Sequence, residues 1–271
     1  MGAWFRPLRR NRSGRRFVCR RPQEHPIRLA VIADIHANLL ALEAVTADIR
    51  TRSVDATVNL GDNVAGPLWP LETVELLAAL GLPTVRGNHD RWLLDRDEAS
   101  LSPADRFAHA VLTPEQRRVQ HALPASIELA EGILAVHGTP SDDSAFLTED
   151  IHQDRLIPAS RQQICERLGA AISRAIVLCG HSHRQSLTQI PGGPLIMNPG
   201  SVGCPVFADI PKANCIEPRS PHARYAILTR HGHRWSAEFF ALEYDWDQAA
   251  ARARDNGFAN WAEALATGAV S

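Results

Sequence analysis

The chain has 271 residues and is 45% hydrophobic, enough to bury the core of one large domain or of two small ones. Its net charge of −1 is unevenly spread, because residues 1–28 hold nine Arg and one Glu and the rest of the chain therefore carries −9. No apolar run approaches the roughly 20 residues that cross a bilayer, and five irregularly spaced cysteines form no CxxC pair, so we expect a soluble, cytoplasmic protein without a zinc ribbon.

The charge difference divides the chain into two parts. We expect residues 1–25 to be a basic, disordered extension and residues 26–271 to form one domain. An Arg-rich, acid-poor segment could also be a targeting segment or an arm that binds nucleic acid. The acidic net charge of the larger part disfavours nucleic acid as a partner.

The first elements of the domain alternate between strand and helix patterns. A short apolar run with β-branched residues starts at Ile27, and residues 39–50 repeat apolar side chains at near-helical spacing. Residues 55–63 repeat the strand pattern, and residues 70–81 predict a helix opened by proline and closed by glycine. Residues 83–90 form a third strand-like run.

A charged segment interrupts this alternation. Residues 91–124 are mostly helical in pattern, with breaks at Pro103 and Pro114, and we expect a helical insertion that covers a nearby site. Three further apolar runs, each ending in a polar turn with glycine, lie at residues 132–140, 174–183 and 193–203. A helix over residues 160–171 separates the first two of these runs.

The chain closes with a hairpin pattern. Residues 223–229 and 234–242 alternate in polarity and are joined through His231 and Gly232, which predicts a β-hairpin, and a helix follows at residues 246–254. Strands and helices therefore alternate first, and a hairpin comes later. This order predicts an α/β architecture in which helices cover sheets and the polar turns gather at the carboxyl ends of the strands.

Five polar turns carry metal-ligand groups. In chain order they are Asp34-Ile35-His36, Gly61-Asp62-Asn63, Gly87-Asn88-His89-Asp90, His137-Gly138 and Gly180-His181-Ser182-His183. Residues two apart in an extended segment point to the same side, so the first and last turns can each direct two ligands to one point. Carboxylate, amide and imidazole groups without thiolates suit Mn²⁺, Fe or Zn²⁺. Burying so many polar groups without a cation would cost on the order of several kcal/mol.

In this order the turns resemble the DxH, GD, GNH[DE], GH and GHxH blocks of the calcineurin-like metallophosphoesterase superfamily. Residues 198–203, Asn-Pro-Gly-Ser-Val-Gly, are similar to a block of its compact bacterial and archaeal phosphodiesterase-like branch. The resemblance implies an α/β fold, a four-layer α-β-β-α sandwich with a helical insertion after the third strand.

The resemblance also implies roles for individual residues. One metal ion would be bound by Asp34, His36 and His183, and a second by Asn88, His137 and His181, with Asp62 bridging the two. We expect two divalent ions, Mn²⁺ first and Fe or Zn²⁺ as alternatives, which share a hydroxide that attacks the phosphorus atom.

Three further assignments concern the substrate. His89 would contact the scissile phosphate and protonate the leaving oxygen, and Asp90 would orient its ring. Arg86, Arg91 and Arg184 flank motif residues and are candidates for gripping a second phosphate or a carboxylate of the substrate, and a solvated charge at a strand end is the default interpretation of each.

The preferred hypothesis is a phosphodiesterase for a small or nucleotide-like phosphate ester. The same metal chemistry would serve a dinucleoside polyphosphate hydrolase, acting for example on diadenosine tetraphosphate, or a Ser/Thr phosphoprotein phosphatase. A scaffold that binds metal without catalysis is a different class, and the presence of His89 beside a full ligand set argues against it. The oligomeric state is left open.

Overall fold

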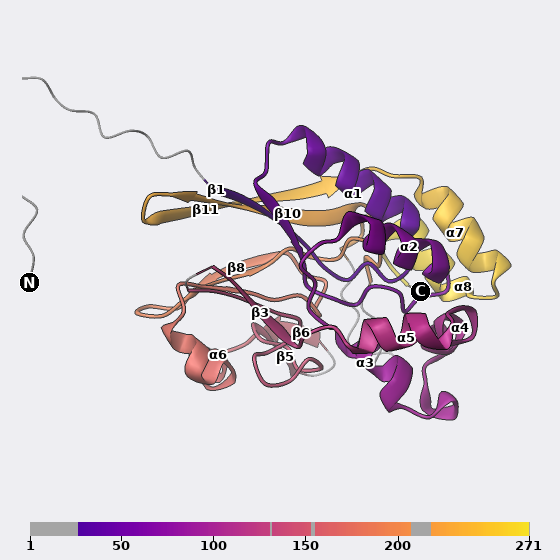
Figure 1. Ribbon diagram of the computed structural model, residues 1–271, viewed down its shortest axis with the longest axis horizontal. Helices are drawn as coiled ribbons and strands as arrows, with labels where there is room; N and C mark the ends of the chain where they lie inside the picture. Colours follow the sequence, from indigo (N-terminus) through magenta and orange to yellow (C-terminus); the bar gives the residue numbers. More distant parts are fainter. Residues whose placement is uncertain (1–26, 131, 153–154, 207–217, 271) are drawn as a thin grey trace, which may run out of the picture.

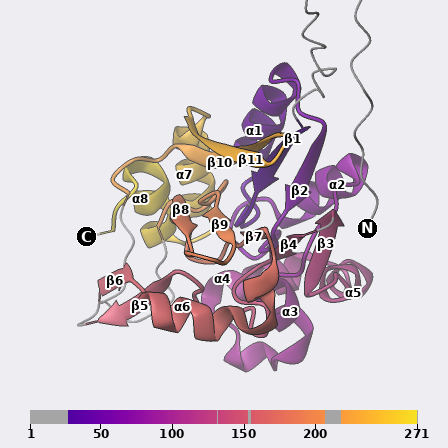
Figure 2. The ribbon, with the colours of Figure 1, turned by 90° about the vertical axis from the view of Figure 1, so that its left-hand side faces the viewer.

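The computed structural model describes residues 27–130, 132–152, 155–206 and 218–270 (Figure 1). The predicted basic extension, residues 1–25, lies outside the described residues. Two sheets form the centre of the fold. Figure 1 shows α1 and α7 above one sheet and α6 beneath the other, and the same order of layers is visible in the turned view of Figure 2. The four-layer sandwich expected from the sequence is therefore confirmed.

The first sheet is mixed and combines strands from the start of the domain with the two strands of the closing hairpin. Its strand order is β11 (Arg234–Leu242), β10 (Ala223–His231), β1 (Ile27–Ile32) and β2 (Ala56–Asn59). In the register of this sheet, Val31 pairs with Val58 of the parallel neighbour and with Ala226 of the antiparallel one. The predicted hairpin thus adds two strands beside β1.

The second sheet comes from the middle of the chain. Its order is β3 (Ser126–Ala130), β4 (Ile133–Val136), β7 (Ile176–Leu178), β9 (Leu195–Asn198) and β8 (Ser186–Gln189). The three apolar runs predicted as strands are the central β4, β7 and β9, which pair in parallel. A small hairpin of β5 (Glu149–His152) and β6 (Arg155–Pro158) stands apart from both sheets.

Alternating side chains of one strand supply two separate cores. Leu29, Val31 and Ala33 pack between the sheets. Ala30 and Ile32 point the other way and pack against α1 (Leu39–Thr51). Because both faces of β1 are buried from Leu29 onward, the sequence from Leu29 to Ala33 is continuously apolar rather than alternating. On the outer face of the second sheet, α6 (Arg161–Leu168) covers β7 and β9.

The predicted helices are present, and their ends follow from the residues named for them. α2 (Pro70–Leu80) begins at proline and ends at Gly81, whose left-handed backbone closes the helix. The insertion contains α3 (Asn88–Asp95), α4 (Pro103–Val111) and α5 (Pro114–His121). Its two prolines open α4 and α5, each behind a capping side chain, Ser102 and Thr113.

Two expectations need correction. The run 83–90 is not a strand, because only Thr84 forms an isolated bridge, to Asn59, and the chain then enters α3. Pro83 has no N–H to donate, which shortens the ladder. After α7 (Trp246–Asp255) the chain adds a helix that the sequence reading missed, α8 (Ala259–Thr267). None of the described helices has the length and apolar character needed to span a membrane.

Candidate metal centre

The predicted ligands meet at one end of the two sheets. Asp34 and His36 follow β1, and Asp62 follows β2. His137 follows β4, His181 and His183 follow β7, and Asn88 opens α3. All seven side chains are buried. The carboxyl ends of parallel strands share an edge of each sheet, and the two sheets face each other, so turns far apart in sequence converge here.

The backbone at this edge is strained. Five of the seven residues adopt positive φ angles, namely Asp34 (56°), His36 (47°), Asp62 (56°), His181 (66°) and His183 (57°). A left-handed conformation outside glycine costs on the order of 1 kcal/mol or more each and persists where the surroundings fix it. Strain of this kind clusters at sites that bind ligands or carry out reactions.

Two groups of ligand atoms are preformed. In the first, the Nε2 atoms of His36 and His183 lie 3.1 Å apart, and Asp34 Oδ1 lies 3.5 Å from His183 Nε2. The donor atoms of these three residues lie within 4.8 Å of one another. The spacing suits one divalent ion held between a carboxylate and two imidazoles.

The second group is equally compact. His137 Nε2 lies 3.1 Å from Asp62 Oδ2 and 3.0 Å from the side-chain oxygen of Asn88. Donor atoms of Asp62, His137 and His181 lie within 4.8 Å of one another. Asp62 Oδ2 also lies 3.8 Å from His36 Nε2, in the first group. Asp62 therefore stands between the two groups, where a bridging ligand is needed.

Each of the four histidines is oriented by a backbone carbonyl. The Nδ1 atoms of three of them donate, His36 to Ala65 at 2.8 Å, His137 to Leu60 at 2.7 Å and His183 to Cys204 at 2.8 Å. His181 instead uses Nε2, which lies 3.1 Å from the Ser144 carbonyl. A ring nitrogen that donates to a carbonyl leaves the other nitrogen deprotonated when the ring is neutral, which is the form that binds a metal.

The electrostatics of the centre call for cations. Oδ2 of Asp34 is buried and has no hydrogen-bond partner among the described residues. Burial and the charge of Asp62 raise the pKa of Asp34 to about 8, against the opposing effect of His137. Burial alone would lower the pKa of His137, but the carboxylates of Asp62 and Asp34 outweigh it and raise that pKa to about 9. Protons therefore balance the buried carboxylates, a role that bound cations would take over.

His181 and His183 behave in the opposite way. Burial, reinforced by the neighbouring His137, lowers the pKa of His181 to about 3. Burial and the ring of His36 hold the pKa of His183 well below its usual range. Both rings are thus neutral near pH 7 and ready to donate a lone pair.

The carboxylate that orients His89 is not the one expected from the sequence. Asp105 Oδ1 lies 2.7 Å from His89 Nδ1, and Ser102 donates to the other Asp105 oxygen at 2.7 Å. Asp90, the predicted partner, folds back onto the start of α3. Its oxygens accept N–H bonds from Asp62, Asn63 and Gly87 at 2.9–3.0 Å. Because Asp90 is the third residue of the helix, its side chain satisfies backbone donors instead.

Asp105 belongs to none of the five motifs, so the sequence pattern could not identify it as the partner of His89. It lies in the first turn of α4, which Ser102 caps. The only sequence signal is a helix start, Ser-Pro-x-Asp, in an insertion expected to cover the site. The insertion therefore supplies a functional side chain as well as a cover.

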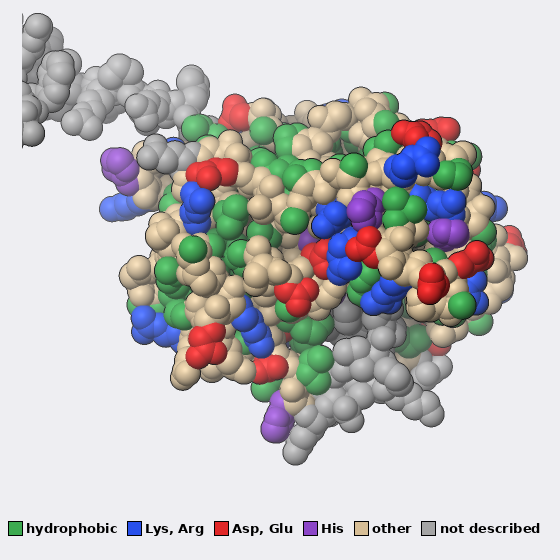
Figure 3. Space-filling model, turned by 60° about the horizontal axis from the view of Figure 1, so that its bottom comes forward, with side chains coloured by type: hydrophobic (Ala, Val, Ile, Leu, Met, Phe, Trp, Pro, Cys, Tyr) green, Lys and Arg blue, Asp and Glu red, His purple; other side chains and the backbone are tan. Residues whose placement is uncertain are grey.

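The three arginines predicted to bind substrate do not face the metal-ligand groups through either adjoining cavity. Arg91 pairs with Asp143 through two bonds of 2.8 Å, and Arg86 donates to the His121 carbonyl. Arg184 is exposed. None of the three lines either cavity at the centre, as far as the described residues define those cavities. Figure 3 likewise shows basic side chains interspersed with acidic ones on the face that it presents.

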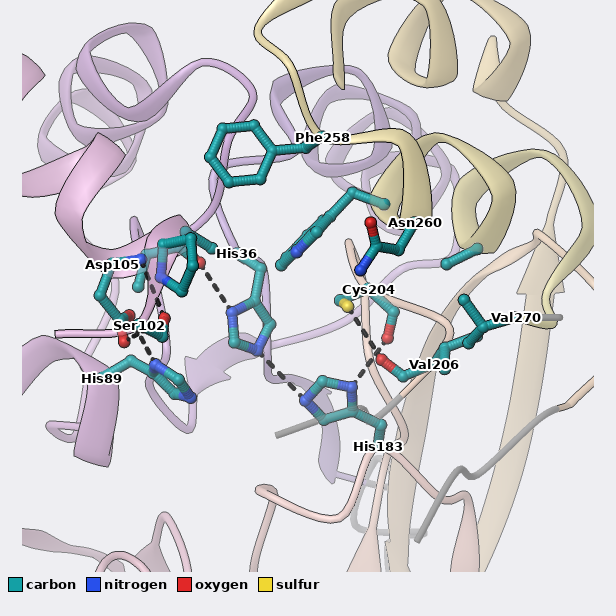
Figure 4. Close-up of a pocket in the computed structure, with 15 residues that line it drawn as sticks. His36, His89, Ser102, Asp105, His183, Cys204, Val206, Phe258, Asn260 and Val270 are labelled. Atoms are coloured by element: carbon teal, nitrogen blue, oxygen red, sulfur yellow. Dashed lines mark hydrogen bonds and ion pairs between the residues drawn. The ribbon is translucent and has the colours of Figure 1, made fainter. Parts of the chain in front are cut away.

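Two cavities adjoin the metal-ligand groups. The smaller, of about 210 Å³, reaches His36, His89 and His183, and Figure 4 shows these residues across from Phe258 and Asn260. The larger, of about 620 Å³, reaches His181 and is lined by Arg96 and Arg167 among others. Ser102 lines both cavities. A phosphorus atom at the centre would therefore have space on two sides.

Comparison with known proteins agrees with this geometry. A metallophosphoesterase from Sphaerobacter thermophilus has 26% sequence identity and a TM-score of 0.67, with 90% of this chain and 100% of that one covered. A hypothetical protein from Pyrococcus horikoshii shares the fold at 17% identity and a TM-score of 0.70, over the same shares of the two chains. An uncharacterized protein of Methanocaldococcus jannaschii is 28% identical over 199 residues, which are 65% of this chain and 76% of that protein.

The family model for the calcineurin-like phosphoesterase superfamily domain matches residues 27–220. That range contains both sheets except the closing hairpin, and all seven predicted ligands. The chain belongs to the calcineurin-like phosphoesterase superfamily.

Proposed function

We propose that the chain is a dinuclear metal-dependent phosphodiesterase. Membership of the superfamily supports hydrolysis of phosphate esters with two metal ions. The observation that favours a diester is the pair of cavities that meet at the ligand groups, one at His36 and His183 and one at His181. A diester has two organic substituents on phosphorus, and each needs a space of its own.

The residues present fit two divalent ions. Asp34, His36 and His183 would hold one ion, Asn88, His137 and His181 the other, and Asp62 would contact both. When bound, such a pair of ions supplies an activated water and neutralises the charge that grows on the phosphoryl oxygens. Nitrogen and oxygen donors without thiolate favour Mn²⁺, with Fe or Zn²⁺ as alternatives.

His89 would protonate the leaving oxygen. It is buried beside the first ligand group, and its ring lies edge-on 5.3 Å from the ring of His36. Asp62 Oδ1 accepts the His89 backbone N–H at 3.0 Å, so the bridging carboxylate also fixes the start of α3. Asp105 holds Nδ1, which leaves Nε2 to carry the proton that is transferred.

Hydrolysis of a dinucleoside polyphosphate is the second candidate. Arg96 and Arg167 line the larger cavity, and guanidinium groups suit a chain of phosphates. Glu149 and Asp150 line the same cavity and offset that charge. Arg167 is also occupied with the Glu149 carbonyl at 2.6 Å. The diester therefore remains the preferred substrate class.

Initial rates on three substrates test this proposal. The Mn²⁺-loaded protein is offered bis-p-nitrophenyl phosphate, p-nitrophenyl phosphate and diadenosine tetraphosphate, with and without a chelator. We expect the first to be turned over fastest, the chelator to abolish turnover, and His89→Ala to lower it strongly. His121→Ala, which removes a half-buried histidine paired with Asp95, serves as the control. No turnover with metal bound would favour a non-catalytic scaffold instead.

A further inference from the structure

The smaller cavity has one reactive wall and one apolar wall. His36, His89 and His183 form the reactive wall. Facing them are Pro103 and Ala104 of the insertion and Phe258 and Trp261 at the start of α8. Phe258 packs edge-on against Phe107 of α4, with ring centroids 5.8 Å apart, so the two segments are in contact.

Part of the apolar wall, Phe258 and Trp261, lies beyond the range that the family model matches. The family match ends at residue 220, whereas α8 spans Ala259–Thr267. The match therefore accounts for the ligands and for His89, but not for Phe258, Asn260 or Trp261. The selectivity that these three side chains provide is therefore not predicted by the family match itself.

The described lining of the cavity disfavours a second phosphate. Among the described residues that line it there is no Lys, Arg or Glu, and its one carboxylate, Asp105, is held by His89 and Ser102. Away from the metal ion that His36 and His183 would hold, a second phosphate would be buried without a cation beside it, which is costly. The substituent that enters this cavity is therefore uncharged.

The size and the walls favour a single flat ring. The volume of about 210 Å³ falls below the roughly 300–1,000 Å³ typical of pockets for drug-sized ligands. The Trp261 ring lies 6.2 Å from that of His36, and their planes are inclined at 67°. Aromatic walls at such angles offer edge and face contacts to a ring. Asn260 adds one amide at the cavity wall, where a polar edge of the ring could bond.

We propose that this cavity binds the leaving group, and that the group is an uncharged planar ring, as in an aryl or nucleoside ester. This rests on the proposed function. His89 assigns the leaving group to this side, because the residue that protonates the leaving oxygen lines the smaller cavity and not the larger one. The other substituent of the diester then occupies the larger, charged cavity.

Equilibrium binding of two phosphonates tests the cavity without requiring turnover. Phenylphosphonate and methylphosphonate carry the same anion, differ in the ring, and have a P–C bond that hydrolysis does not cleave. By calorimetry on the Mn²⁺-loaded protein, we expect phenylphosphonate to bind about tenfold more tightly, as aromatic contacts of this kind provide. An equal affinity for the two compounds would overturn the proposal.

Two variants test whether the smaller cavity causes the tighter binding of phenylphosphonate. Trp261→Leu keeps an apolar side chain at its packing position, and Ala104→Leu fills the cavity from the other side. Each should bring the ratio of the two affinities close to one while methylphosphonate binding is unchanged. Trp246→Leu is the matched control, because Trp246 is a half-buried tryptophan on α7 that does not line the cavity. A ratio that survives Trp261→Leu would refute the assignment.

Kinetics with methyl p-nitrophenyl phosphate then test whether the substituent in the smaller cavity is the leaving group. Its leaving group is the ring, so Trp261→Leu should lower kcat/KM about tenfold and Trp246→Leu should not. An unchanged kcat/KM would place the leaving ring elsewhere and overturn the proposal. If the phosphonate ratio behaves as expected but no diester is hydrolysed, the cavity assignment stands and the proposed function fails.

Discussion

At the scale of single residues, the structure differs most from the sequence prediction at His89, whose ring contacts Asp105 rather than Asp90. His89 and Asp105 lie 16 positions apart and are both buried, and their contact of 2.7 Å joins the start of α3 to the first turn of α4. Asp105 contacts no metal-ligand residue in any described bond. We therefore expect it to act on the proposed reaction through the orientation of His89.

Replacing Asp105 by Asn should lower kcat by about 10- to 100-fold, the usual effect of removing a group that orients an active-site histidine. KM and metal content should change little, because the ligand groups do not use this carboxylate. Steady-state kinetics with metal analysis check both expectations. Asp95→Asn removes the acid of an exposed Asp–His pair with His121 and is the control. A fall in metal content equal to the fall in kcat would contradict the assignment.

Metal affinity should depend on pH through two of the ligands. The pKa of Asp34 is raised to about 8 by burial and Asp62, and that of His137 to about 9, where the carboxylates overcome burial. Both groups hold a proton at pH 7 in the metal-free protein and must lose it to coordinate. Binding thus releases protons, so affinity rises with pH up to about 9.

For each proton released, the dissociation constant of Mn²⁺ should fall about tenfold per pH unit between pH 6.5 and 8. Calorimetry in buffers of different ionisation enthalpy measures both the affinity and the number of protons. The His137→Gln variant has one proton fewer to release, so its dissociation constant for Mn²⁺ should depend less steeply on pH. An affinity independent of pH across this interval would be inconsistent with the buried charges described above.

At the scale of elements, the start of α3 connects several parts of the centre. Asp90 accepts backbone N–H groups of Gly87 on its own turn and of Asp62 and Asn63 on the turn after β2. Gly87 is needed there, since a Cβ atom at that position would overlap the Asp62 carboxylate. The element that presents Asn88 and His89 is thereby fixed to the bridging residue.

Asp90→Asn should destabilise the protein by about 2–3 kcal/mol, because buried N–H donors lose a carboxyl oxygen as acceptor and one faces an amide N–H. Urea unfolding of the metal-free protein measures the change in free energy. Glu72→Gln replaces an exposed acid at the third position of α2 and should change it by less than about 0.5 kcal/mol. Equal stability of the two variants would show that Asp90 does not anchor the turn.

Most elements were predictable because local signals agreed with tertiary packing. Pro70 and Gly81 set both ends of α2, and the apolar runs of β4, β7 and β9 fill the second sheet. The run 83–90 failed as a strand because its pairing stops after one bridge. The side chains of β3 and β8 alternate between exposed and half-buried, and β5 and β6 pair with each other apart from both sheets. None of these four strands therefore shows a clear apolar pattern in the sequence.

At the scale of the whole molecule, the site is made by the meeting of two sheets. One ligand group draws Asp34 and His36 from the first sheet and His183 from the second, and the other group likewise takes Asp62 from the first and His137 and His181 from the second. The motif order predicted which residues take part, because four of the five motifs follow a strand and the fifth, residues 87–90, opens α3 beside them. It could not predict the cavities, which depend on how α4 and α8 pack across the opening.

Because ions would link the two sheets, metal should stabilise the whole fold. At a Mn²⁺ concentration of 100 times Kd, each bound ion adds about 2.7 kcal/mol. For a domain of this size that corresponds to a rise in Tm of roughly 5–10 °C for each ion. Differential scanning calorimetry with Mn²⁺ and with a chelator measures the shift. A variant with both His181→Ala and His183→Ala should show almost none, and an equal shift in that variant would place the bound metal elsewhere.

The most direct test of a dinuclear phosphodiesterase is a titration of chelator-treated protein with Mn²⁺ while hydrolysis of bis-p-nitrophenyl phosphate is followed. The geometry predicts no turnover without metal and a rate that levels off at about two ions per chain, one for each ligand group. A full rate at one ion per chain, or turnover that persists in excess chelator, would contradict the account.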